Sequence, residues 1–365
     1  MKIIGPIAGI GTRLRPFTLS KPKAFIRVAG KTVLDHILDK FTNTFDPDTE
    51  LILIVGYKKR QIIDYIRKKY NSRFNLTFIE QIPRGYKEDI PYYWGLGEAV
   101  YLAHKQFEKE DFKSSEDNKR AGSLIFLSDM ISIDEYSYLM YRYYESDVDG
   151  IITVMEVPKE DASSYGIVVV DENQLITNLV EKPKKYISNL AIAGIYAFSN
   201  TTTFALFKHL KKYLDQRDER SGEVYLTESL QDLVDDGFNI AAVTHKQGIL
   251  DFGRPSELLN GNQYLLETNF VKREDFQKLN ITIERSYLKN PLNIGKNTKI
   301  INSVIGPYVS IGKDSYIVNA ILQNCVIEER VILENMISKN SIIGNNVSIE
   351  NICKDNLIIG DKSTY

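Results

Sequence analysis

The feature that most constrains the fold of this chain is a six-residue repeat that begins near residue 290. The repeat reads Ile-Gly, two variable residues, then Thr, Val or Ser, then one more residue, at residues 294–299, 305–310, 311–316 and 343–348. One inward aliphatic side chain in six forms a continuous buried column when successive coils stack. The spacing therefore predicts stacked triangular coils and argues against a plain meander of strands. About 70 residues allow roughly four coils of three hexapeptides each.

The residues around the repeats extend this prediction. Aliphatic residues recur every five or six positions and are expected inside the coils, at Ile300, Val304, Ile317, Ile321, Val326, Ile327 and Val331. Small residues suit the tight corners, with Ser303, Ser315, Ala320 and Ser341 as candidates. Ahead of the coils, residues 256–290 are expected to form a helical linker with Leu258, Leu259, Tyr264 and Leu265 on its apolar side.

Up to about residue 255, strand-like and helix-like segments alternate. Residues 51–55 are fully apolar and end at Gly56, which is typical of a buried strand, whereas residues 61–70 have apolar side chains at helical spacing. Further strands are expected at residues 2–7, 76–80, 123–127, 150–157, 165–170 and 192–198, and further helices at 32–41, 204–213 and 226–234. Residues 109–120 are charged and are expected to form a solvated loop or helix end. The alternation predicts an α/β domain with a mostly parallel sheet.

A glycine-containing segment, residues 8–16, follows directly on the first predicted strand. Glycine lets the backbone approach a ligand closely, and consecutive N–H groups at such a turn bind anions. Four cations lie in this segment or shortly after it, namely Arg13, Arg15, Lys21 and Lys23. The spacing fits neither a Walker loop nor the glycine fingerprint of Rossmann cofactor sites. Four cations around one glycine turn indicate a polyphosphate ligand, and a tight turn with exposed cations is the alternative.

The same segment resembles the signature of the sugar-phosphate nucleotidyltransferases, Gly-x-Gly-Thr-Arg-Leu-x-Pro-x-Thr followed by Lys-Pro-Lys. Other family motifs are matched in order by Leu127-Ser128-Asp129, Tyr165-Gly166-Ile167-Val168, Glu181-Lys182-Pro183, Ala193-Gly194-Ile195-Tyr196-Ala197-Phe198, Gly222-Glu223-Val224-Tyr225-Leu226-Thr227-Glu228 and Asp251-Phe252-Gly253-Arg254-Pro255. The resemblance covers about residues 1–260, and hexapeptide coils occur in many long members of the family. Ala8 replaces the usual first glycine of the loop, and Arg27 stands where many members have proline.

The resemblance implies a fold and three parts of the chain. Residues 1–255 would form the catalytic domain, an α/β domain of Rossmann type with a mixed, mostly parallel sheet. Residues 256–290 would be the helical linker. Residues 291–365 would form a left-handed parallel β-helix of hexapeptide repeats.

The resemblance also implies a reaction in which a sugar 1-phosphate attacks the α-phosphorus of a nucleoside triphosphate and pyrophosphate leaves. Such chemistry depends on positioning and on cations. By the family pattern, Arg13 and Lys23 would be catalytic, and Asp129 and Asp251 would bind Mg²⁺. The residues implied to contact the nucleotide are Ala8, Gly9, Gly11, Thr12, Gln81, Gly95 and Gly97. Those implied to contact the sugar phosphate are Gly166, Glu181, Lys182, Gly194 and Tyr196.

Several alternatives stay open at the level of sequence. Glucose 1-phosphate with dTTP or UTP is favoured, but the motifs fix neither base nor sugar. A non-catalytic, sugar-nucleotide-sensing homologue is one alternative, and a bifunctional enzyme with an acyltransferase in the coils is another. Acyltransferases on such coils use a histidine base, and residues 290–365 contain none. The coils are therefore expected to be a scaffold that promotes homo-oligomers. Residues 82–94 are rich in aromatic side chains, and three roles stay open for this segment: a lid, a partner contact or a plain surface insertion.

Composition limits the remaining function classes. The formal net charge of −2 gives no general electrostatic reason to expect nucleic-acid or anionic-membrane binding. The sequence contains no run of about 18 apolar residues, so no membrane-spanning helix is predicted. The two cysteines cannot form a disulfide framework, and the four histidines have no metal-ligand spacing. A cytoplasmic protein is therefore expected.

Overall fold

The computed structural model describes residues 1–108, 114–217, 222–268 and 277–365. The described chain divides into two compact units. The first comprises Met1–Gly9 and Ile37–Ile249, and the second comprises Ile10–His36 and Leu250–Tyr365. The segment Ile10–His36, which sequence analysis places in the first domain, therefore packs as part of the same unit as the C-terminal coils.

The first unit is built on one mixed sheet with the strand order β12-β11-β13-β8-β1-β4-β5, and β10 pairs with both β13 and β14. Its strands are β1 (Lys2–Pro6), β4 (Glu50–Val55), β5 (Asn75–Glu80), β8 (Ser123–Phe126), β10 (Gly150–Glu156), β11 (Gly166–Val170), β12 (Ile176–Glu181), β13 (Leu190–Phe198) and β14 (Ile240–Thr244). The run β8-β1-β4-β5 is parallel throughout, whereas β13 is antiparallel to β8, β10 and β11. This arrangement confirms the predicted α/β class with a mixed sheet.

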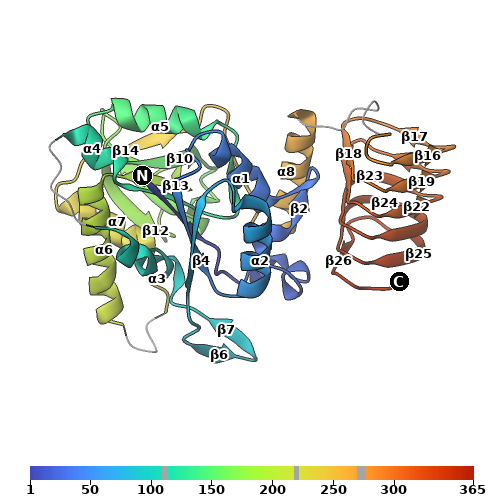
Figure 1. Ribbon diagram of the computed structural model, residues 1–365, viewed down its shortest axis with the longest axis horizontal. Helices are drawn as coiled ribbons and strands as arrows, with labels where there is room; N and C mark the ends of the chain where they lie inside the picture. The colour runs from blue at the N-terminus through green and yellow to red at the C-terminus, as the bar shows by residue number, and fades with distance from the viewer. Residues whose placement is uncertain (109–113, 218–221, 269–276) are drawn as a thin grey trace. The chain divides into compact units, whose positions relative to one another are not determined.

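The sequence of β4 explains its central position. Leu51 to Val55 are all buried, as expected for a parallel strand that is covered on both faces. The helices α3 (Gly95–Leu102), α6 (Asn200–Asp215) and α7 (Leu226–Asp235) pack together against the sheet (Figure 1). The side chain of Ser199 caps α6 by accepting the N–H of Thr202.

The remaining described helices are α1 (Val33–Thr42), α2 (Lys59–Tyr70), α4 (Ser115–Arg120), α5 (Tyr136–Glu145) and α8 (Pro255–Thr268). Short strands outside the main sheet are β2 (Arg27–Val28), β3 (Lys31–Thr32), β6 (Gly85–Lys87), β7 (Ile90–Tyr92), β9 (Met130–Ser132) and β15 (Ile249–Asp251). The helices predicted near residues 32–41, 61–70, 204–213 and 226–234 are thereby confirmed. Of the charged stretch at 109–120, residues 109–113 lie outside the described residues, and α4 covers most of the rest.

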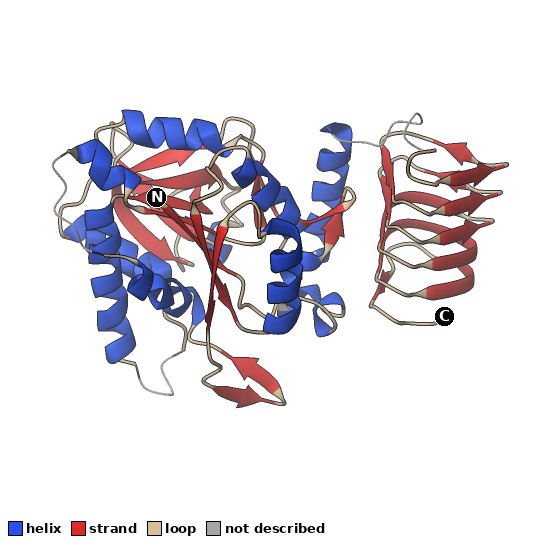
Figure 2. Ribbon diagram, in the orientation of Figure 1, coloured by secondary structure: helices blue, strands red, loops and turns tan. Residues whose placement is uncertain are grey.

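The C-terminal part of the second unit is an all-parallel sheet of short strands that stack as successive rungs (Figure 2). Its strands are β16 (Thr282–Glu284), β17 (Tyr287–Leu288), β18 (Leu292–Ile294), β19 (Lys299–Ile301), β20 (Val304–Ile305), β21 (Val309–Ile311), β22 (Tyr316–Val318), β23 (Ile321–Ile327), β24 (Ile332–Ile343), β25 (Ser348–Cys353) and β26 (Ile358–Ile359). Ile300, Ile317, Leu333 and Ile349 stand in register, and all four are buried. This column confirms the predicted β-helix of hexapeptide repeats.

Two details of the C-terminal prediction are wrong. Val304 and Ile321 point outward, with 41% and 47% of their surface exposed, because they occupy the outer positions of β20 and β23. The helical linker is also shorter than predicted. Helix α8 ends at Thr268, and β16 and β17 already pair with the coils before residue 291. The residues 269–276 of the predicted linker lie outside the described residues.

Asparagines hold the corners of the coils. Asn302, Asn319, Asn335 and Asn351 all have a positive φ, which asparagine tolerates better than most residues. Their side chains bond from one coil to the next, from Asn302 to Asn319 at 2.7 Å and from Asn319 to Asn335 at 2.9 Å. The same asparagine therefore adopts the turn conformation and links one coil to the next.

Candidate functional site

The glycine segment of the second unit folds back on itself between Gly11 and Lys23. Gly11 has φ 69°, and a Cβ there would lie 2.8 Å from the Cβ of Lys23. The Thr18 hydroxyl donates to the Gly11 carbonyl at 2.9 Å, and the Leu14 N–H donates to it at 3.0 Å. Only glycine allows this close approach, so the sequence motif fixes the relation between Gly11 and the predicted catalytic Lys23.

Buried apolar side chains anchor the same loop and leave its cations at the surface. Leu14 and Phe17 are buried, whereas Thr12, Arg13 and Arg15 are exposed and Lys23 is half-buried. The loop thus has Arg13 and Arg15 at its surface and Lys23 partly accessible, and the polyphosphate ligand stays a prediction.

Lys21 does not belong to this set of cations, which corrects the sequence prediction. It is only 7% exposed, and its ammonium group pairs with Glu328 and with Asp361, both on the coils. A lysine held by two carboxylates cannot also meet a triphosphate. The sequence could not reveal this because both partners lie more than 300 residues away.

The start of the segment belongs to the first unit, directly after β1. Ala8 is buried, and its carbonyl accepts the Tyr57 N–H at 3.3 Å. A Cβ on Gly56 would lie 2.9 Å from the Cβ of Ala8, whereas Gly9 is exposed. Of these two predicted nucleotide contacts, only Gly9 has an exposed backbone.

The predicted base contact Gln81 is part of a buried polar network. Its amide nitrogen donates to Glu98 at 2.7 Å and to the Gly95 carbonyl at 3.2 Å. Glu98, which is 3% exposed, also accepts from the Arg84 guanidinium and from the Trp94 N–H. Glu98 was missed by sequence analysis, and it joins Gln81 to the first turn of α3. The donor half of the Gln81 amide is therefore already engaged.

Gly97 serves packing in this structure. Its N–H donates to the Val224 carbonyl at 2.9 Å, and a Cβ there would lie 2.8 Å from that oxygen. Gly95 has φ 87° and opens α3. The two glycines that were predicted to meet the nucleotide thus bring α3 against the segment that contains Val224.

The aromatic insertion at residues 82–94 is the hairpin of β6 and β7. Arg84 fixes its base, with the guanidinium paired to Glu98 and lying 4.0 Å from the centre of the Trp94 ring. Between the hairpin and the start of α2 lies a cavity of about 460 Å³, bordered by Tyr86 and Tyr93. Burial raises the pKa of Tyr93 to about 12.

The sugar-phosphate residues of the first unit converge around Gly166. A Cβ on Gly166 would lie 3.2 Å from Glu181 Oε2 and 3.2 Å from Thr227 Oγ1. The Thr227 hydroxyl donates to Glu181 at 2.7 Å, and Lys182 Nζ lies 3.2 Å from the other carboxylate oxygen. Lys182 has φ 43°, its N–H donates to the Tyr165 carbonyl at 3.0 Å, and its side chain remains exposed. Thr227 was not predicted, although it lies within a quoted motif.

Tyr196 and Gly194 have structural surroundings. Tyr196 is buried among apolar residues, and burial together with the charge of Glu181 raises the pKa of its hydroxyl. Gly194 has φ 75°, and a Cβ there would lie 2.7 Å from the sulfur of Met130. Its carbonyl accepts the Leu127 N–H at 2.9 Å. Gly194 therefore shapes the turn that contains Asp129, at the carboxyl end of β8.

Asp251 ends β15 in the second unit and has a carboxylate neighbour that sequence analysis missed. The Gly253 N–H donates to Asp251 Oδ1 at 2.9 Å. A Cβ on Gly253 would meet both Asp251 Oδ1 and Glu257 Oε2, at 3.2 and 3.4 Å. Burial and the charge of Asp251 raise the pKa of Glu257. Glu257 Oε2 is buried and has no hydrogen-bond partner among the described residues.

This pair of carboxylates fits a hard divalent cation, which prefers oxygen ligands. The described residues contain no group of three or more His, Cys, Asp or Glu side chains placed to hold a metal ion. A cation here would therefore need further oxygens, and substrate phosphates are a suitable source.

Comparison with known proteins agrees with these features. Residues 7–268 match the model of the nucleotidyl transferase family. The chain therefore belongs to the nucleotidyl transferase family, which confirms the resemblance read from the motifs.

Two relatives and one solved structure illustrate the similarity. The bifunctional protein GlmU of Methanocaldococcus jannaschii is 32% identical over 261 residues, which are 71% of this chain and 53% of that protein. UTP–glucose-1-phosphate uridylyltransferase AglF of Haloferax volcanii is 31% identical over 267 residues, 73% of this chain and 97% of that protein. UDP-glucose pyrophosphorylase from Acinetobacter baumanii superposes with a TM-score of 0.56 at 21% identity, covering 76% of this chain and 97% of that one.

The solved structure shows a shared fold only, because the identity is low. The chain spans about half the length of the GlmU proteins that it matches. Within the described part of the chain, no helix combines the length and the apolar character that crossing a bilayer requires.

Proposed function

We propose that this chain is a sugar-1-phosphate nucleotidyltransferase. A phosphate oxygen of the sugar 1-phosphate attacks the α-phosphorus of a nucleoside triphosphate, the bond from that phosphorus to the bridging oxygen breaks, and pyrophosphate leaves. The observation that carries this proposal is that Gly166, Glu181, Lys182 and Thr227, which come from three separate family motifs, lie close together.

Each group has a role that its surroundings support. Lys182 is exposed beside the carboxylate of Glu181, so a phosphate can reach its ammonium group. Glu181 accepts hydrogen bonds, as sugar hydroxyls require, and the absence of a Cβ on Gly166 lets a sugar ring approach the backbone there. Arg13 and Lys23, from the folded glycine loop, would stabilise the charge that develops on the triphosphate.

A divalent cation, which we take to be Mg²⁺, would neutralise phosphate charge when bound. Asp129 and Asp251 are the proposed protein ligands. Glu257 is a further candidate, because its Oε2 is buried and has no hydrogen-bond partner among the residues that the structure describes. Activity should be lost in EDTA and restored by Mg²⁺, and turnover that persists without divalent ions would contradict this part.

UTP or dTTP and glucose 1-phosphate are the proposed substrates. The similarity to AglF, a UTP–glucose-1-phosphate uridylyltransferase that this chain matches over nearly the whole length of that protein, supports UTP with glucose 1-phosphate. Gln81 remains the proposed contact to a pyrimidine, through its carbonyl oxygen, because its nitrogen already donates to Glu98 and Gly95.

A second candidate function is an additional acyltransferase, because several relatives are named as bifunctional. The histidines of this chain all precede the coils, which favours a scaffold. Consumption of acetyl-CoA with a sugar-amine acceptor would decide for the bifunctional form.

The coils are proposed to mediate homo-oligomers. Tyr287, Val304, Ile321, Ile337 and Cys353 stand in register on one face of the coils, and the first four are 41–62% exposed. An exposed apolar face of this kind favours self-association. Both cysteines are free, which accords with the proposed cytoplasmic location.

The deciding experiment is a substrate panel. Pyrophosphate release and nucleotide-sugar formation are measured with Mg²⁺, glucose 1-phosphate and each of the four common triphosphates. We expect product with UTP or dTTP. If no triphosphate gives product with any of several sugar 1-phosphates while binding persists, the sensing homologue is the correct alternative.

A further inference from the structure

At one corner of the coils, a single coil lacks the glycine that the other coils have at the equivalent position. At four of the five equivalent positions, the residue after the last aliphatic side chain is glycine, namely Gly295, Gly312, Gly344 and Gly360. A Cβ at any of these four would collide with a neighbouring atom. The third position in this series is Glu328 instead of glycine. A charged residue at a corner that otherwise excludes side chains requires a specific role.

Glu328 has its partners in the segment that carries the glycine loop. Its side chain is fully buried, and it accepts from the ammonium group of Lys21 and from the Arg27 N–H at 3.1 Å. Asn345 of the next coil adds a hydrogen bond at 2.6 Å. Burial raises the pKa of Glu328, so the nearby ammonium group is what favours its charged form.

The next coil contributes a second carboxylate to the same lysine. Asp361 lies 2.9 Å from Lys21 Nζ and accepts from the Ser20 hydroxyl at 2.6 Å and from the Asn345 N–H at 2.9 Å. Beside it, a Cβ on Gly360 would lie 2.8 Å from Cβ of Pro16. Lys21 is therefore clamped between two successive coils, and the loop lies directly on the backbone there.

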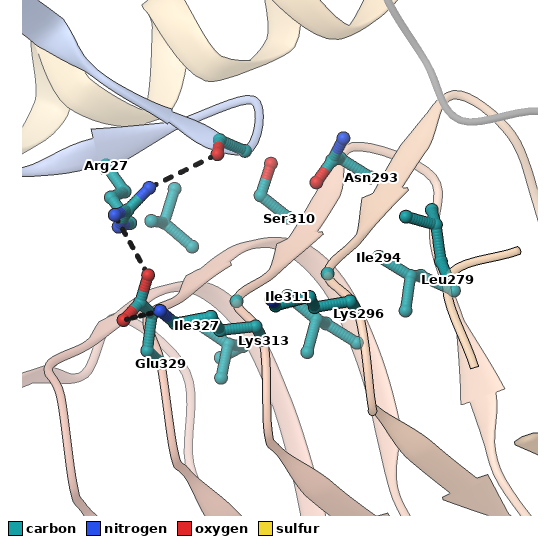
Figure 3. Close-up of a pocket in the computed structure, with 14 residues that line it drawn as sticks. Arg27, Leu279, Asn293, Ile294, Lys296, Ser310, Ile311, Lys313, Ile327 and Glu329 are labelled. Atoms are coloured by element: carbon teal, nitrogen blue, oxygen red, sulfur yellow. Dashed lines mark hydrogen bonds and ion pairs between the residues drawn. The ribbon is translucent and has the colours of Figure 1, made fainter. Parts of the chain in front are cut away.

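Two further contacts hold the hairpin that follows the loop. The Arg27 guanidinium reaches Glu329 at 2.9 Å, beside a cavity of about 350 Å³ (Figure 3). Asn262 of α8 is fully buried, accepts the Ala29 N–H at 2.9 Å and accepts the Ser310 hydroxyl at 2.6 Å. The segment from Ser20 to Ala29 is thus held on the coils by charged and polar bonds at both ends.

A buried ion cluster fixes the positions of its members more than it adds to the stability of the fold. Desolvation offsets much of the attraction within such a cluster, so its net stabilisation is small, but displacing one partner leaves an uncompensated buried charge and is strongly unfavourable. Lys21 therefore has one favourable location. Lys23 is two residues away and packs against Gly11, so the location of Lys21 sets that of Lys23 and of the loop with Arg13.

We propose that Glu328 and Asp361 of the coils are positioning residues for the nucleotide-binding loop, acting through Lys21. This inference rests on the proposed nucleotidyltransferase activity for its kinetic consequence. The coils then take part in nucleotide binding, in addition to serving as a scaffold.

The kinetic test uses the full chain. Glu328→Gln and Asp361→Asn should raise the KM for the triphosphate and lower kcat, together by about tenfold or more, because small misplacements of catalytic groups are costly. The KM for the sugar 1-phosphate should change less than about twofold, because Lys182 and Glu181 belong to the other compact unit. The matched control is Ser338→Ala, which removes a buried coil hydroxyl bonded to Ser341 and to the Lys354 carbonyl, away from residues 10–36.

A triple variant separates position from stability. Lys21→Met with Glu328→Leu and Asp361→Asn removes the charge of all three members of the cluster, and such replacements keep or raise stability in many buried ion clusters. We expect its melting temperature to stay near that of the wild type while the triphosphate KM rises. Wild-type kinetics in this variant, or equal rises in the KM for both substrates, would overturn the inference.

Hydrogen exchange distinguishes this inference from the proposed function. Backbone amides of residues 10–27 should exchange about tenfold faster in Glu328→Gln and Asp361→Asn than in the wild type and in Ser338→Ala. If the wild type makes no product, the proposed function fails, and exchange alone decides whether the coils hold the loop. Unchanged exchange in both variants would show that they do not.

Discussion

At the scale of residues, the partners of each cation decide what it can bind. Lys21 and Lys182 both belong to short Lys-Pro motifs. The side chain of Lys21 is 9% exposed between two carboxylates, whereas that of Lys182 is 43% exposed beside one. Of these two lysines, only Lys182 lies beside a proposed sugar-binding residue, Glu181, and is also accessible to a phosphate.

Lys182→Ala should therefore raise the KM for the sugar 1-phosphate by about tenfold or more, because a charge-assisted hydrogen bond to phosphate is lost. The KM for the triphosphate should change less than about twofold. Lys185→Ala, in the same exposed turn, is the control and should leave both constants unchanged. Steady-state kinetics with each substrate varied in turn make the comparison, and equal effects on both substrates would contradict the assignment.

His245 gives the first unit a pH-dependent stability. Burial lowers the pKa of His245, and Lys40 lowers it further, while Asp134, 3.4 Å away, opposes this. The unfolded chain then binds the proton first as pH falls, so the contribution is present above about pH 6.5 and is lost as pH falls through the lower pKa of the folded state.

We expect unfolding free energy to fall below about pH 6.5 with a slope of at most about 1.4 kcal/mol per pH unit from this one proton. His245→Gln should flatten that part of the curve. His104→Gln, outside this cluster, serves as the control. Urea titrations at several pH values measure the slope, and an unchanged slope in His245→Gln would disprove the role.

At the scale of elements, the coil corners combine backbone conformation with side-chain bonding. Asn319 has φ 51°, accepts from Asn302 at 2.7 Å and donates to Asn335 at 2.9 Å. Glycine would keep the conformation and lose the bonds, whereas alanine would lose the bonds and also strain the backbone.

Asn319→Ala should therefore destabilise the coils by about 1 kcal/mol more than Asn319→Gly does. Both should be less stable than the wild type. Chemical denaturation followed by far-ultraviolet circular dichroism gives the difference. If the two variants were equally stable, the side-chain hydrogen bonds between coils would by themselves account for asparagine at the corners.

At the scale of the whole molecule, exposed apolar side chains follow the register of the coils. Ile321 and Ile337 are paired in neighbouring coils and are 47% and 45% exposed. Ile332, which is 42% exposed, pairs with Tyr316 on a different run of strands.

Ile321→Lys with Ile337→Lys should thus convert the proposed homo-oligomer to a smaller species, because charge disfavours burial of that face. Ile332→Lys is the matched control and should keep the oligomer. Multi-angle light scattering at micromolar concentration gives the mass. A monomeric wild type would refute self-association, and an oligomer that survives both changes would place the interface elsewhere.

Local patterns predicted most of the fold. The apolar run of β4, the helical spacing in α2 and the hexapeptide repeat each depend on near neighbours in sequence, so they could be identified without coordinates. The motif residues at Gly166, Glu181 and Lys182 were likewise identified from sequence, and the structure places them together. Glu98, Thr227 and Glu257 were missed, because their partners come from other parts of the chain or from a turn whose geometry a sequence does not give.

The α/β class, the coils and the family could be identified from residue order alone, because they depend on periodicity and on short motifs whose residues act locally. The tertiary structure alone decided the partners of the charges. The sequence predicts that Lys21 is one of four phosphate-binding cations. The fold instead brings Glu328 and Asp361 to it from more than 300 residues away. A charge is defined by what surrounds it in space, and Coulombic and desolvation energies depend on distances that chain separation does not reveal.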